Sequence, residues 1–414
     1  MSPMKSLRSI RPEHAMRENR PFMNEVRACL GASALLLLVA AAATAQEDAG
    51  PGFVLQGEGG LVTAFALDPS SPATLYAATA RGLYKTTDAG ATWLRTGAGL
   101  RDHSVLALAV DPTEPSRLYA TTDTAGVFRS LDGGQHWAEA NRGIAARYNG
   151  AIAIDSHRPG GVYVGAEAGR IFRSEDSGES WRELASPTST VSITVIIEDP
   201  EKHDHLFVGT NSEGVFWSVD AGATWARPSG RLSRGTVWNL TFDTGSGEMY
   251  AGTHDGLFRS TDRGRTWVPT NNGLRSWNIL TLVTHPATPE TLYAGTAAAI
   301  YRSSDRGRTW HELKEDLYVT ALAIDPRSPS TLYAATHLGV LKSETAGAQW
   351  KALRMAPTLA DPTAPGDPKR GSEKPEAASA LPLLPLGSKA SKPAQPLPAL
   401  PVRPSPPSPE GGRP

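Results

Sequence analysis

The chain repeats one short polar pattern seven times, and each copy ends in tryptophan. Residues 259–267 read RSTDRGRTW and residues 302–310 read RSSDRGRTW, and all the copies are spaced 40 to 44 residues apart. A repeat of this length indicates an array of supersecondary units. Six of the seven copies follow the pattern Ser/Thr-x-Asp-x-Gly-x-Thr/Ser/His-Trp. The seven tryptophans are Trp93, Trp137, Trp181, Trp225, Trp267, Trp310 and Trp350.

Each unit contains the same four strand-like runs, which are clearest in the second unit. The runs are VLALAVDP (105–112), RLYATT (117–122), GVFRS (126–130) and WAEA (137–140). Short runs of Val, Leu, Tyr, Phe and Thr bounded by Gly, Asp and Pro are strand and hairpin signals. Four-stranded units stacked around an axis form a β-propeller, in which each sheet is covered by its two neighbours.

We therefore predict an all-β fold, a seven-bladed β-propeller of four-stranded blades, over residues 61–355. The segment GFVLQ (52–56) could add a strand where the first and last blades meet. An open solenoid is the alternative, but it would need polar capping units at both ends.

The repeated pattern is predicted to be a structural turn. Its aspartate can fold its carboxylate back onto backbone N–H groups two or three residues on, its glycine supplies a restricted backbone angle, and its tryptophan packs onto the blade edge. In the seventh copy Thr345 replaces the aspartate, so that turn is expected to be the weakest. The six aspartates are Asp88, Asp132, Asp176, Asp220, Asp262 and Asp305.

These turns resemble the Asp-box, or BNR, repeat family over roughly 300 residues of the chain. That family includes sialidases, sortilin-type receptors, xyloglucanase-type endoglucanases and photosystem II assembly/stability factors. The resemblance implies that the box lies on the perimeter of a propeller, away from the axial site at which the family's enzymes work. It implies the fold and leaves the function open.

The first 45 residues are predicted to be a secretory signal peptide. A basic stretch precedes the apolar run 28–45, which ends in Ala43-Thr44-Ala45, with small residues at the positions a signal peptidase requires. An uncleaved membrane anchor is the alternative, because the 18 apolar residues nearly reach spanning length. Cleavage would remove Cys29, the chain's one cysteine, and would place the protein outside the cytoplasm, secreted or periplasmic.

Two further segments flank the predicted propeller. Residues 46–60 form an N-terminal lead-in, and residues 356–414 hold 16 of the chain's 33 prolines. A segment of this composition cannot bury enough surface to offset its chain entropy. It is predicted to be a disordered, polyproline-like tail.

Charge and motif content argue against several functions. The net charge of −1, without a dense basic segment, argues against nucleic-acid binding. Each box offers one carboxylate where calcium needs six to eight oxygens, and His203 and His205 lack a third ligand nearby, so neither a metal nor a cofactor is predicted. Membrane contact is expected only if the N-terminal segment is retained.

Catalytic patterns are also missing from the sequence. The Arg-Ile-Pro motif that sialidases of the resembled family carry is absent, as are nucleophile-elbow and His-Glu-x-x-His motifs. Glu167, Asp255 and Asp316 lie on predicted loops of one face, but no spacing pairs them for glycoside hydrolysis.

What remains is a recognition surface. In a propeller, the loops entering the inner strands and the loops between the second and third strands crowd one face around the axis. Aromatic side chains with arginine on such loops favour binding, although Trp238 and Trp277 could instead pack between blades. The candidate binding residues are Arg147, Tyr148, Trp238, Arg275, Trp277 and Tyr318.

The sequence therefore favours a secreted or periplasmic, monomeric, non-catalytic scaffold that resembles an assembly factor. Its partner would be another protein or a polymer of the cell envelope, for which a glycan is one candidate. The alternative is a carbohydrate-active enzyme, sialidase-like or xyloglucanase-like, or a glycan-binding propeller.

Overall fold

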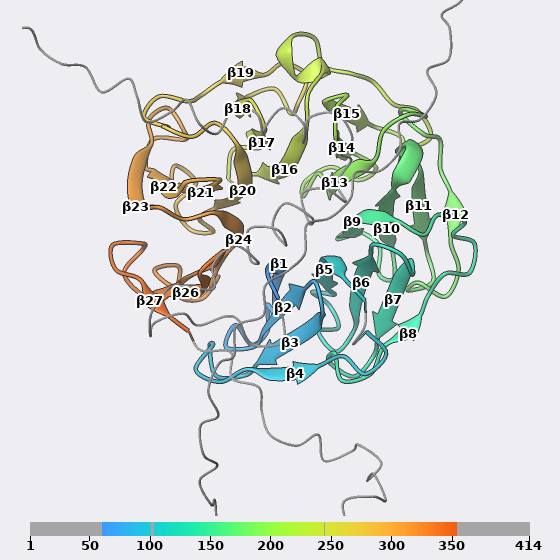
Figure 1. Ribbon diagram of the computed structural model, residues 1–414. Helices are drawn as coiled ribbons and strands as arrows, with labels where there is room; N and C mark the ends of the chain where they lie inside the picture. The colour runs from blue at the N-terminus through green and yellow to red at the C-terminus, as the bar shows by residue number, and fades with distance from the viewer. Residues whose placement is uncertain (1–59, 101–102, 244, 354–414) are drawn as a thin grey trace, which may run out of the picture. The chain divides into compact units, whose positions relative to one another are not determined.

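The computed structural model describes residues 60–100, 103–243 and 245–353, which form a ring of small antiparallel sheets (Figure 1). Each sheet is one blade built from consecutive strands, so the repeat of the sequence is also the repeat of the structure. The predicted seven-bladed β-propeller is confirmed. The predicted signal segment, the strand at 52–56 and the proline-rich tail lie outside the described residues.

The first two strands of each blade form its inner half. The inner strands are β1 (Val62–Leu67), β5 (Val105–Val110), β9 (Asn149–Ile154), β13 (Ile193–Glu198), β16 (Val237–Phe242), β20 (Ile279–Thr284) and β24 (Val319–Ile324). The second strands are β2 (Leu75–Thr79), β6 (Leu118–Thr122), β10 (Val162–Ala166), β14 (Leu206–Thr210), β17 (Met249–Thr253), β21 (Leu292–Thr296) and β25 (Leu332–Thr336). Every residue of the second strands is buried, because neighbouring blades cover both faces of each sheet.

The remaining strands form the outer half. The third strands are β3 (Gly82–Thr86), β7 (Val127–Ser130), β11 (Ile171–Ser174), β15 (Val215–Ser218), β18 (Gly256–Ser260), β22 (Ala299–Ser303) and β26 (Gly339–Ser343). The outer strands are β4 (Leu94–Thr96), β8 (Ala138–Glu139), β12 (Arg182–Glu183), β19 (Val268–Pro269), β23 (His311–Glu315) and β27 (Lys351–Ala352). Blade 4 has three strands where four were expected, which corrects the sequence prediction for that blade.

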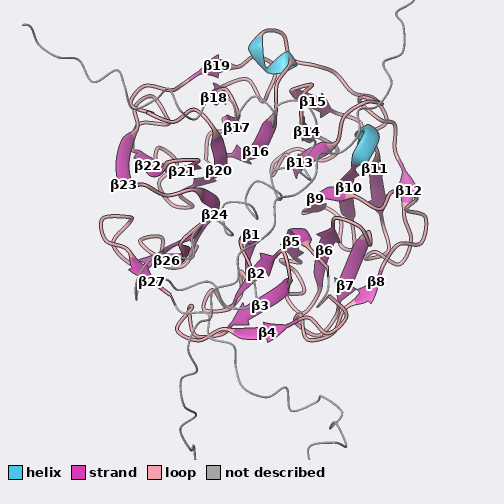
Figure 2. Ribbon diagram, in the orientation of Figure 1, coloured by secondary structure: helices cyan, strands magenta, loops and turns pink. Residues whose placement is uncertain are grey.

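Helical structure among the described residues is limited to two short turns, drawn in cyan in Figure 2. They are η2 (Glu167–Gly169), which follows the second strand of blade 3, and η3 (Arg231–Ser233), which lies on the rim. Neither is long and apolar enough to cross a bilayer.

The hydrophobic core is divided among the seams between blades. Each of the seven buried clusters draws its residues from two adjacent blades. The seam between the last and first blades packs Tyr333 and Leu353 against Trp93. Thr320 Oγ1 also donates to the Val62 carbonyl at 2.7 Å, and the Tyr333 hydroxyl donates to the Ala89 carbonyl at 3.1 Å. In the described part of the chain, the ring therefore closes by face-to-face packing without a shared strand.

The box turn forms as predicted, with one difference in its hydrogen bonds. In the first box, Asp88 Oδ1 accepts the N–H of Thr92, four residues on, at 2.8 Å, whereas two or three residues had been expected. In the second box, Asp132 Oδ1 also accepts the N–H of Gln135, three residues on, at 3.0 Å, as predicted. The nearer N–H, that of Gly90, donates instead to the Thr86 hydroxyl at 3.0 Å. The same two bonds recur in the other five boxes that have an aspartate. The Ser/Thr at the end of the third strand thus takes the position that the prediction gave to the carboxylate.

The seventh box keeps its turn without a carboxylate. Gly347 N–H donates to the Ser343 hydroxyl at 2.9 Å, and Gln349 N–H donates to the Thr345 hydroxyl at 2.8 Å. A single hydroxyl oxygen therefore replaces the carboxylate, and this box makes fewer hydrogen bonds than the others.

The box tryptophans lie in the seams and link each blade to the preceding one. Trp181 Nε1 donates to the Ala140 carbonyl at 2.8 Å, and Trp310 Nε1 donates to the Thr270 carbonyl at 3.1 Å. In the closing seam, Trp93 of blade 1 is only 1% exposed and packs against blade 7. The tryptophan therefore packs between two blades and helps to hold them together, a larger role than the predicted packing onto a blade edge.

A second repeated turn follows the inner strands. An aspartate directly after the strand accepts N–H groups two and three residues on, as Asp325 Oδ1 does from Arg327 at 2.8 Å and Ser328 at 3.1 Å. Blade 6 has His285 at this position, and its Nδ1 accepts the N–H groups of Ala287 at 3.2 Å and Thr288 at 3.0 Å. Only a ring with an unprotonated Nδ1 can accept these bonds.

The first prediction concerns the closing seam. Trp93→Ala should lower the free energy of unfolding by about 3–5 kcal/mol, because it empties a buried site that joins two blades. Denaturant unfolding measures this loss. Trp277→Ala, which removes an indole that is 58% exposed, is the matched control and should change stability by less than about 0.5 kcal/mol. Equal losses for the two variants would contradict the role of Trp93.

The second prediction concerns pH. Burial, followed by the charge of Arg302, lowers the pKa of His285 below its ordinary value of 6.5. The unfolded chain therefore binds the proton more tightly, and stability present above pH 6.5 is lost as pH falls through the folded pKa. His285→Asp, which installs the residue of the other blades, should remove this part of the loss in unfolding experiments between pH 7 and about 5. The exposed control His311→Asp should leave the profile unchanged, and an unaltered profile for His285→Asp would refute the assignment.

Candidate binding face at the propeller axis

The loops at the start of the inner strands and the turns after the second strands meet on one face, which we call the axial face. In every blade the residue after the second strand donates its N–H to the carbonyl of the residue before the inner strand. Examples are Glu167 to Tyr148 at 3.2 Å and His337 to Tyr318 at 3.0 Å. The backbone therefore holds both sets of loops together whatever their side chains are, as the sequence had indicated.

Each inner strand is irregular at its second residue. The register against the second strand shifts there in all seven blades, which is the mark of a β-bulge. In blade 3 this residue is Gly150, where an added Cβ would lie 2.7 Å from the Ile193 carbonyl oxygen. In blade 5 the residue is Trp238, so the bulge sets where this indole lies.

Trp238 and the loop before β20 form one cluster on blades 5 and 6. The half-buried Trp238 donates its Nε1 hydrogen to Asn278 Oδ1 at 3.1 Å. Asn278 follows Trp277, which is 58% exposed, so the indole of Trp277 is not part of the core. Arg275 in the same loop is exposed and lies 3.7 Å from the Glu312 carboxylate. Of the alternatives left open by the sequence, surface exposure holds for Trp277 and partial burial for Trp238.

The position of Trp277 is unusual among the large exposed hydrophobic residues of the described chain. The other four lie on outer strands or in box turns, at Leu94, Leu131, Val219 and Val268. Trp277 alone lies on a loop that enters an inner strand.

Two further positions lie on other blades. Tyr148, before β9, is half-buried, and burial followed by the charges of Asp123 and Glu167 raises its pKa to about 12. Its neighbour Arg147 is exposed, and the Arg147 carbonyl accepts the Gly126 N–H at 3.1 Å.

Tyr318, before β24, has its pKa raised by burial, and its N–H donates to His337 Nδ1 at 3.1 Å. The six predicted residues therefore share one face at three separate places. The structure joins Trp238 to the loop of Trp277 through Asn278, and it places Arg275 of the same loop beside Glu312 of the outer strand β23. The Arg147–Tyr148 pair and Tyr318 lie on other blades.

The acidic and histidine candidates are dispersed. Glu167 begins η2 in blade 3, Asp255 follows β17 in blade 5 and Asp316 precedes β24 in blade 7. His203 stacks on His157 with ring centroids 3.9 Å apart. No group of three or more His, Cys, Asp or Glu suited to a metal occurs within residues 60–100, 103–243 and 245–353.

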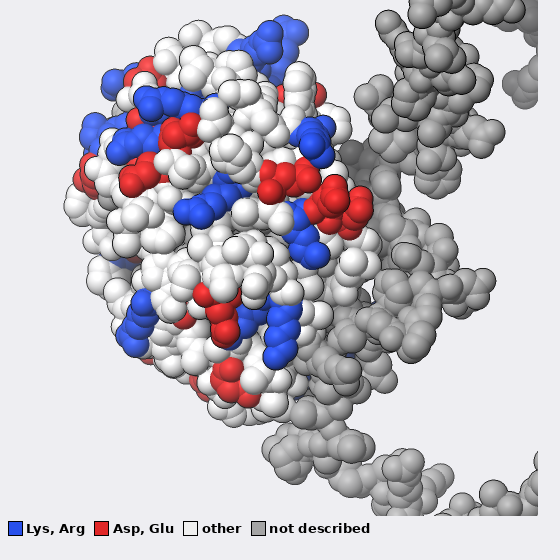
Figure 3. Space-filling view, turned by 90° about the vertical axis from the view of Figure 1, so that its left-hand side faces the viewer, with Lys and Arg blue, Asp and Glu red and all other residues white. Residues whose placement is uncertain are grey.

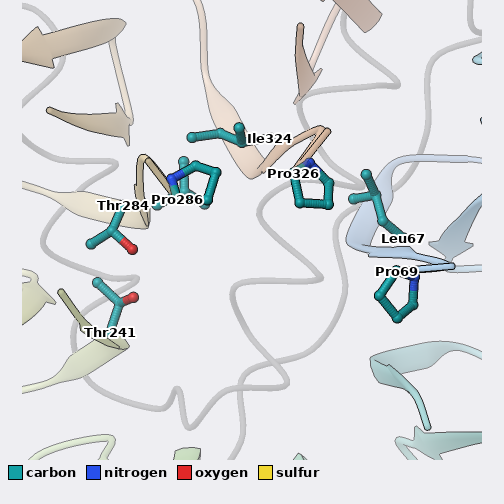
Figure 4. Close-up of a pocket in the computed structure, with 8 residues that line it drawn as sticks. Leu67, Pro69, Thr241, Thr284, Pro286, Ile324 and Pro326 are labelled. Carbon is teal, nitrogen blue, oxygen red and sulfur yellow. The ribbon is translucent and has the colours of Figure 1, made fainter. Parts of the chain in front are cut away.

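A pocket of about 360 Å³ lies at the opposite mouth of the axis, where inner strands of blades 1, 5, 6 and 7 end (Figure 4). Its lining is mostly aliphatic and includes one proline from each of three loops that follow inner strands. Sequence reasoning missed this pocket, although the signal was present in the residue pairs at 68–69, 285–286 and 325–326, each of which ends in proline. The lining residues are Leu67, Pro69, Thr241, Val283, Thr284, Pro286, Ile324 and Pro326.

Charges on the perimeter are mixed in sign. The side of the ring around β23 carries basic and acidic side chains close together (Figure 3). Salt bridges on the outer parts of the blades include Arg259 with Glu248 at 2.5 Å and Arg170 with Glu183 at 2.7 Å. Arg263 of the fifth box pairs with Asp199 of blade 4, which is fully buried. These arginines therefore act in pairs between strands and blades.

The seven box turns and the ring of blades define a BNR-type β-propeller. The family model described as photosynthesis system II assembly factor YCF48 matches residues 63–322, more than half of the chain. The chain belongs to this family.

Comparison with solved structures gives two groups of similar propellers. The GH74 xyloglucanase from Xanthomonas campestris is 20% identical with a TM-score of 0.62, covering 73% of this chain and 56% of the enzyme. YCF48 bound to D1 peptide is 18% identical with a TM-score of 0.55, covering 72% of this chain and 97% of that protein. YCF48 from Cyanidioschyzon merolae is 16% identical with a TM-score of 0.56, covering 70% and 98%.

This chain thus spans about half the length of the xyloglucanases it matches and nearly the whole of the YCF48 proteins. At these identities the likeness concerns the fold. None of the curated proteins compared with the chain matches its sequence.

Proposed function

We propose that the protein is an exported, non-catalytic propeller that holds a segment of another protein on its axial face. The observation that carries this proposal is Trp277, an indole left 58% exposed on that face in the same loop as the exposed Arg275. Tryptophan and arginine are enriched among the residues that dominate protein interfaces. The family supports a protein partner, because one of its members has been solved with a bound peptide.

A glycan is the second candidate partner. An exposed indole is a flat apolar surface with a polar edge, which also suits a sugar ring. The similarity to xyloglucanases favours this candidate, and with it a carbohydrate-active enzyme. The acidic residues of the axial face argue for binding without hydrolysis, because Glu167, Asp255 and Asp316 belong to three different blades.

Export is the part of the proposal that depends on residues 1–45. If the signal is cleaved after Ala45, the exported protein starts at Gln46 and contains no cysteine. N-terminal sequencing of the protein from its native host should read Gln46 first. An intact N-terminus in the membrane fraction would instead indicate an anchored protein.

The fourth prediction tests the axial face. The partner is first captured with the wild-type protein, identified by mass spectrometry and then titrated in pure form. The variant Trp277→Ala/Arg275→Ala should bind it at least about 30-fold more weakly, because each such anchor contributes on the order of 2 kcal/mol. The thermal melt should stay close to that of the wild type.

The matched control removes an exposed apolar side chain and an exposed arginine from the perimeter. Val268, 57% exposed, and Arg265 fulfil this role, and Val268→Ala/Arg265→Ala should bind like the wild type. Equal affinity for wild type and the axial variant would reject the axial face as the binding site. Release of sugar from xyloglucan or sialosides by the pure protein would favour the enzymatic alternative.

A further inference from the structure

Blade 4 lacks the outer strand that completes each of the other six blades. Its sheet ends at β15, and only one isolated bridge, Trp217 with Ala226, continues the expected pairing. Trp217 and Ala226 exchange both backbone bonds, at 2.9 and 2.8 Å. The chain therefore starts an outer strand and leaves it after one residue pair.

Blades 2 and 5 show how the chain can satisfy the corresponding edge. In blade 2 the Val127 carbonyl accepts the Ala140 N–H at 2.8 Å, and the Val127 N–H donates to Asn141 Oδ1 at 2.8 Å. In blade 5, Leu257 makes the same two bonds with Thr270 N–H at 2.9 Å and Asn271 Oδ1 at 2.7 Å. Two residues, three and four positions after the box tryptophan, satisfy the outer edge of the third strand.

Blade 4 has Pro228 and Ser229 at these two positions. Proline has no N–H to donate, so it cannot form the bond that Ala140 forms. Strand alternation directs the backbone N–H and C=O of Val215 to the same side as those of Trp217, which is the outer edge. Neither outward group of Val215 has a hydrogen-bond partner among residues 60–100, 103–243 and 245–353.

This unpaired edge is buried. Val215 is 0% exposed, and a buried backbone group without a partner costs free energy. The Nε1 hydrogen of Trp217, on the same strand, is also buried and without a partner in the described part of the chain. The edge of β15 therefore has one backbone donor and one backbone acceptor that the protein's own described residues leave unused.

A loop covers this edge without bonding to it. We call residues 227–234 the strap. Pro228 and Leu232 of the strap are buried, and the Arg227 guanidinium lies 4.4 Å from the centre of the Phe216 ring and pairs with Glu213. The strap shields the edge from water, which is one way proteins protect an edge strand.

We propose that the outer edge of β15 binds an extended peptide by strand addition, with the strap moving aside. The unused N–H and C=O of one residue require a donor and an acceptor at the spacing that a peptide backbone provides. An added strand would satisfy both groups, as the residues after β8 and β19 do in blades 2 and 5. The edge lies on the outer rim, so this proposal does not depend on the axial face.

The test uses a peptide with the sequence of residues 138–143, AEANRG, which contains the two residues that close blade 2. The labelled peptide is titrated into the full chain, and hydrogen exchange of the Val215 amide is followed. Wild type should bind with a dissociation constant of about 1 mM or below, and exchange at Val215 should slow. The same peptide with an N-methyl group at the residue equivalent to Ala140 should bind at least about tenfold more weakly.

The decisive variant is Pro228→Ala/Ser229→Asn, which restores the donor and the acceptor found in blade 2. It should melt at a higher temperature than the wild type and bind the peptide at least about tenfold more weakly, because its own chain closes the edge. Pro269→Ala, in the completed blade 5, is the matched control and should bind like the wild type.

Two outcomes would overturn the proposal. One is no saturable binding by the wild type up to about 10 mM peptide, and the other is equal affinity for the wild type and the closed-edge variant. If the variant does not fold, the two peptides are compared on the wild-type protein alone. Equal affinity for the unmodified and the N-methylated peptide then overturns the proposal. Trp277→Ala should leave this binding unchanged, which separates the edge from the axial face.

Discussion

The structure depends on covering both faces of every blade. A four-stranded sheet of this size has apolar residues on both sides, so no blade is stable without two neighbours. The box tryptophan and the aromatic residue of the second strand supply that cover, and in several seams they also form a hydrogen bond to the neighbouring blade. Tyr76 reaches the next blade's box at the Gly133 carbonyl, 3.0 Å away, and Trp181 reaches back to Ala140. The outward faces of blades 1 and 7 are covered only where Trp93 of blade 1 packs against blade 7. The ring must therefore close.

This dependence explains why the sequence predicted the architecture well. The features that build the seams are local and repeated, so their period is visible without knowledge of any contact. The predictions that were wrong concern positions where neighbouring groups compete for the same hydrogen-bond partner. The box carboxylate was assigned to nearby N–H groups, but the Thr86 hydroxyl and its equivalents already accept the Gly90 N–H and its equivalents. Blade 4 lacks an outer strand, and it has Pro228, which cannot donate an N–H, where blade 2 has Ala140, a difference of one residue that the repeat does not reveal.

The candidate site was predictable in position more than in detail. Propeller connectivity alone places the loops before the inner strands on one face, and the repeated backbone bonds hold them there. Whether an aromatic side chain on those loops packs or protrudes depends on its neighbours in three dimensions. Trp238 and Trp277 illustrate this, because Asn278 holds the first by a hydrogen bond while the second remains exposed. The pocket at the opposite mouth combines residues from four blades, a grouping that a sequence read unit by unit does not reveal.

The positions of the repeat that build the fold differ from those that are candidates for binding, because the two sets form different kinds of hydrogen bond. At the box, the side chains make the turn, so residue types are nearly identical from unit to unit. At the residue before each inner strand, the carbonyl makes the conserved bond, and the side chain is free to differ. Those seven positions hold Leu61, Ser104, Tyr148, Ser192, Thr236, Asn278 and Tyr318. A repeat with side-chain bonds on its perimeter and backbone bonds at its axis can therefore change what it binds without losing its fold.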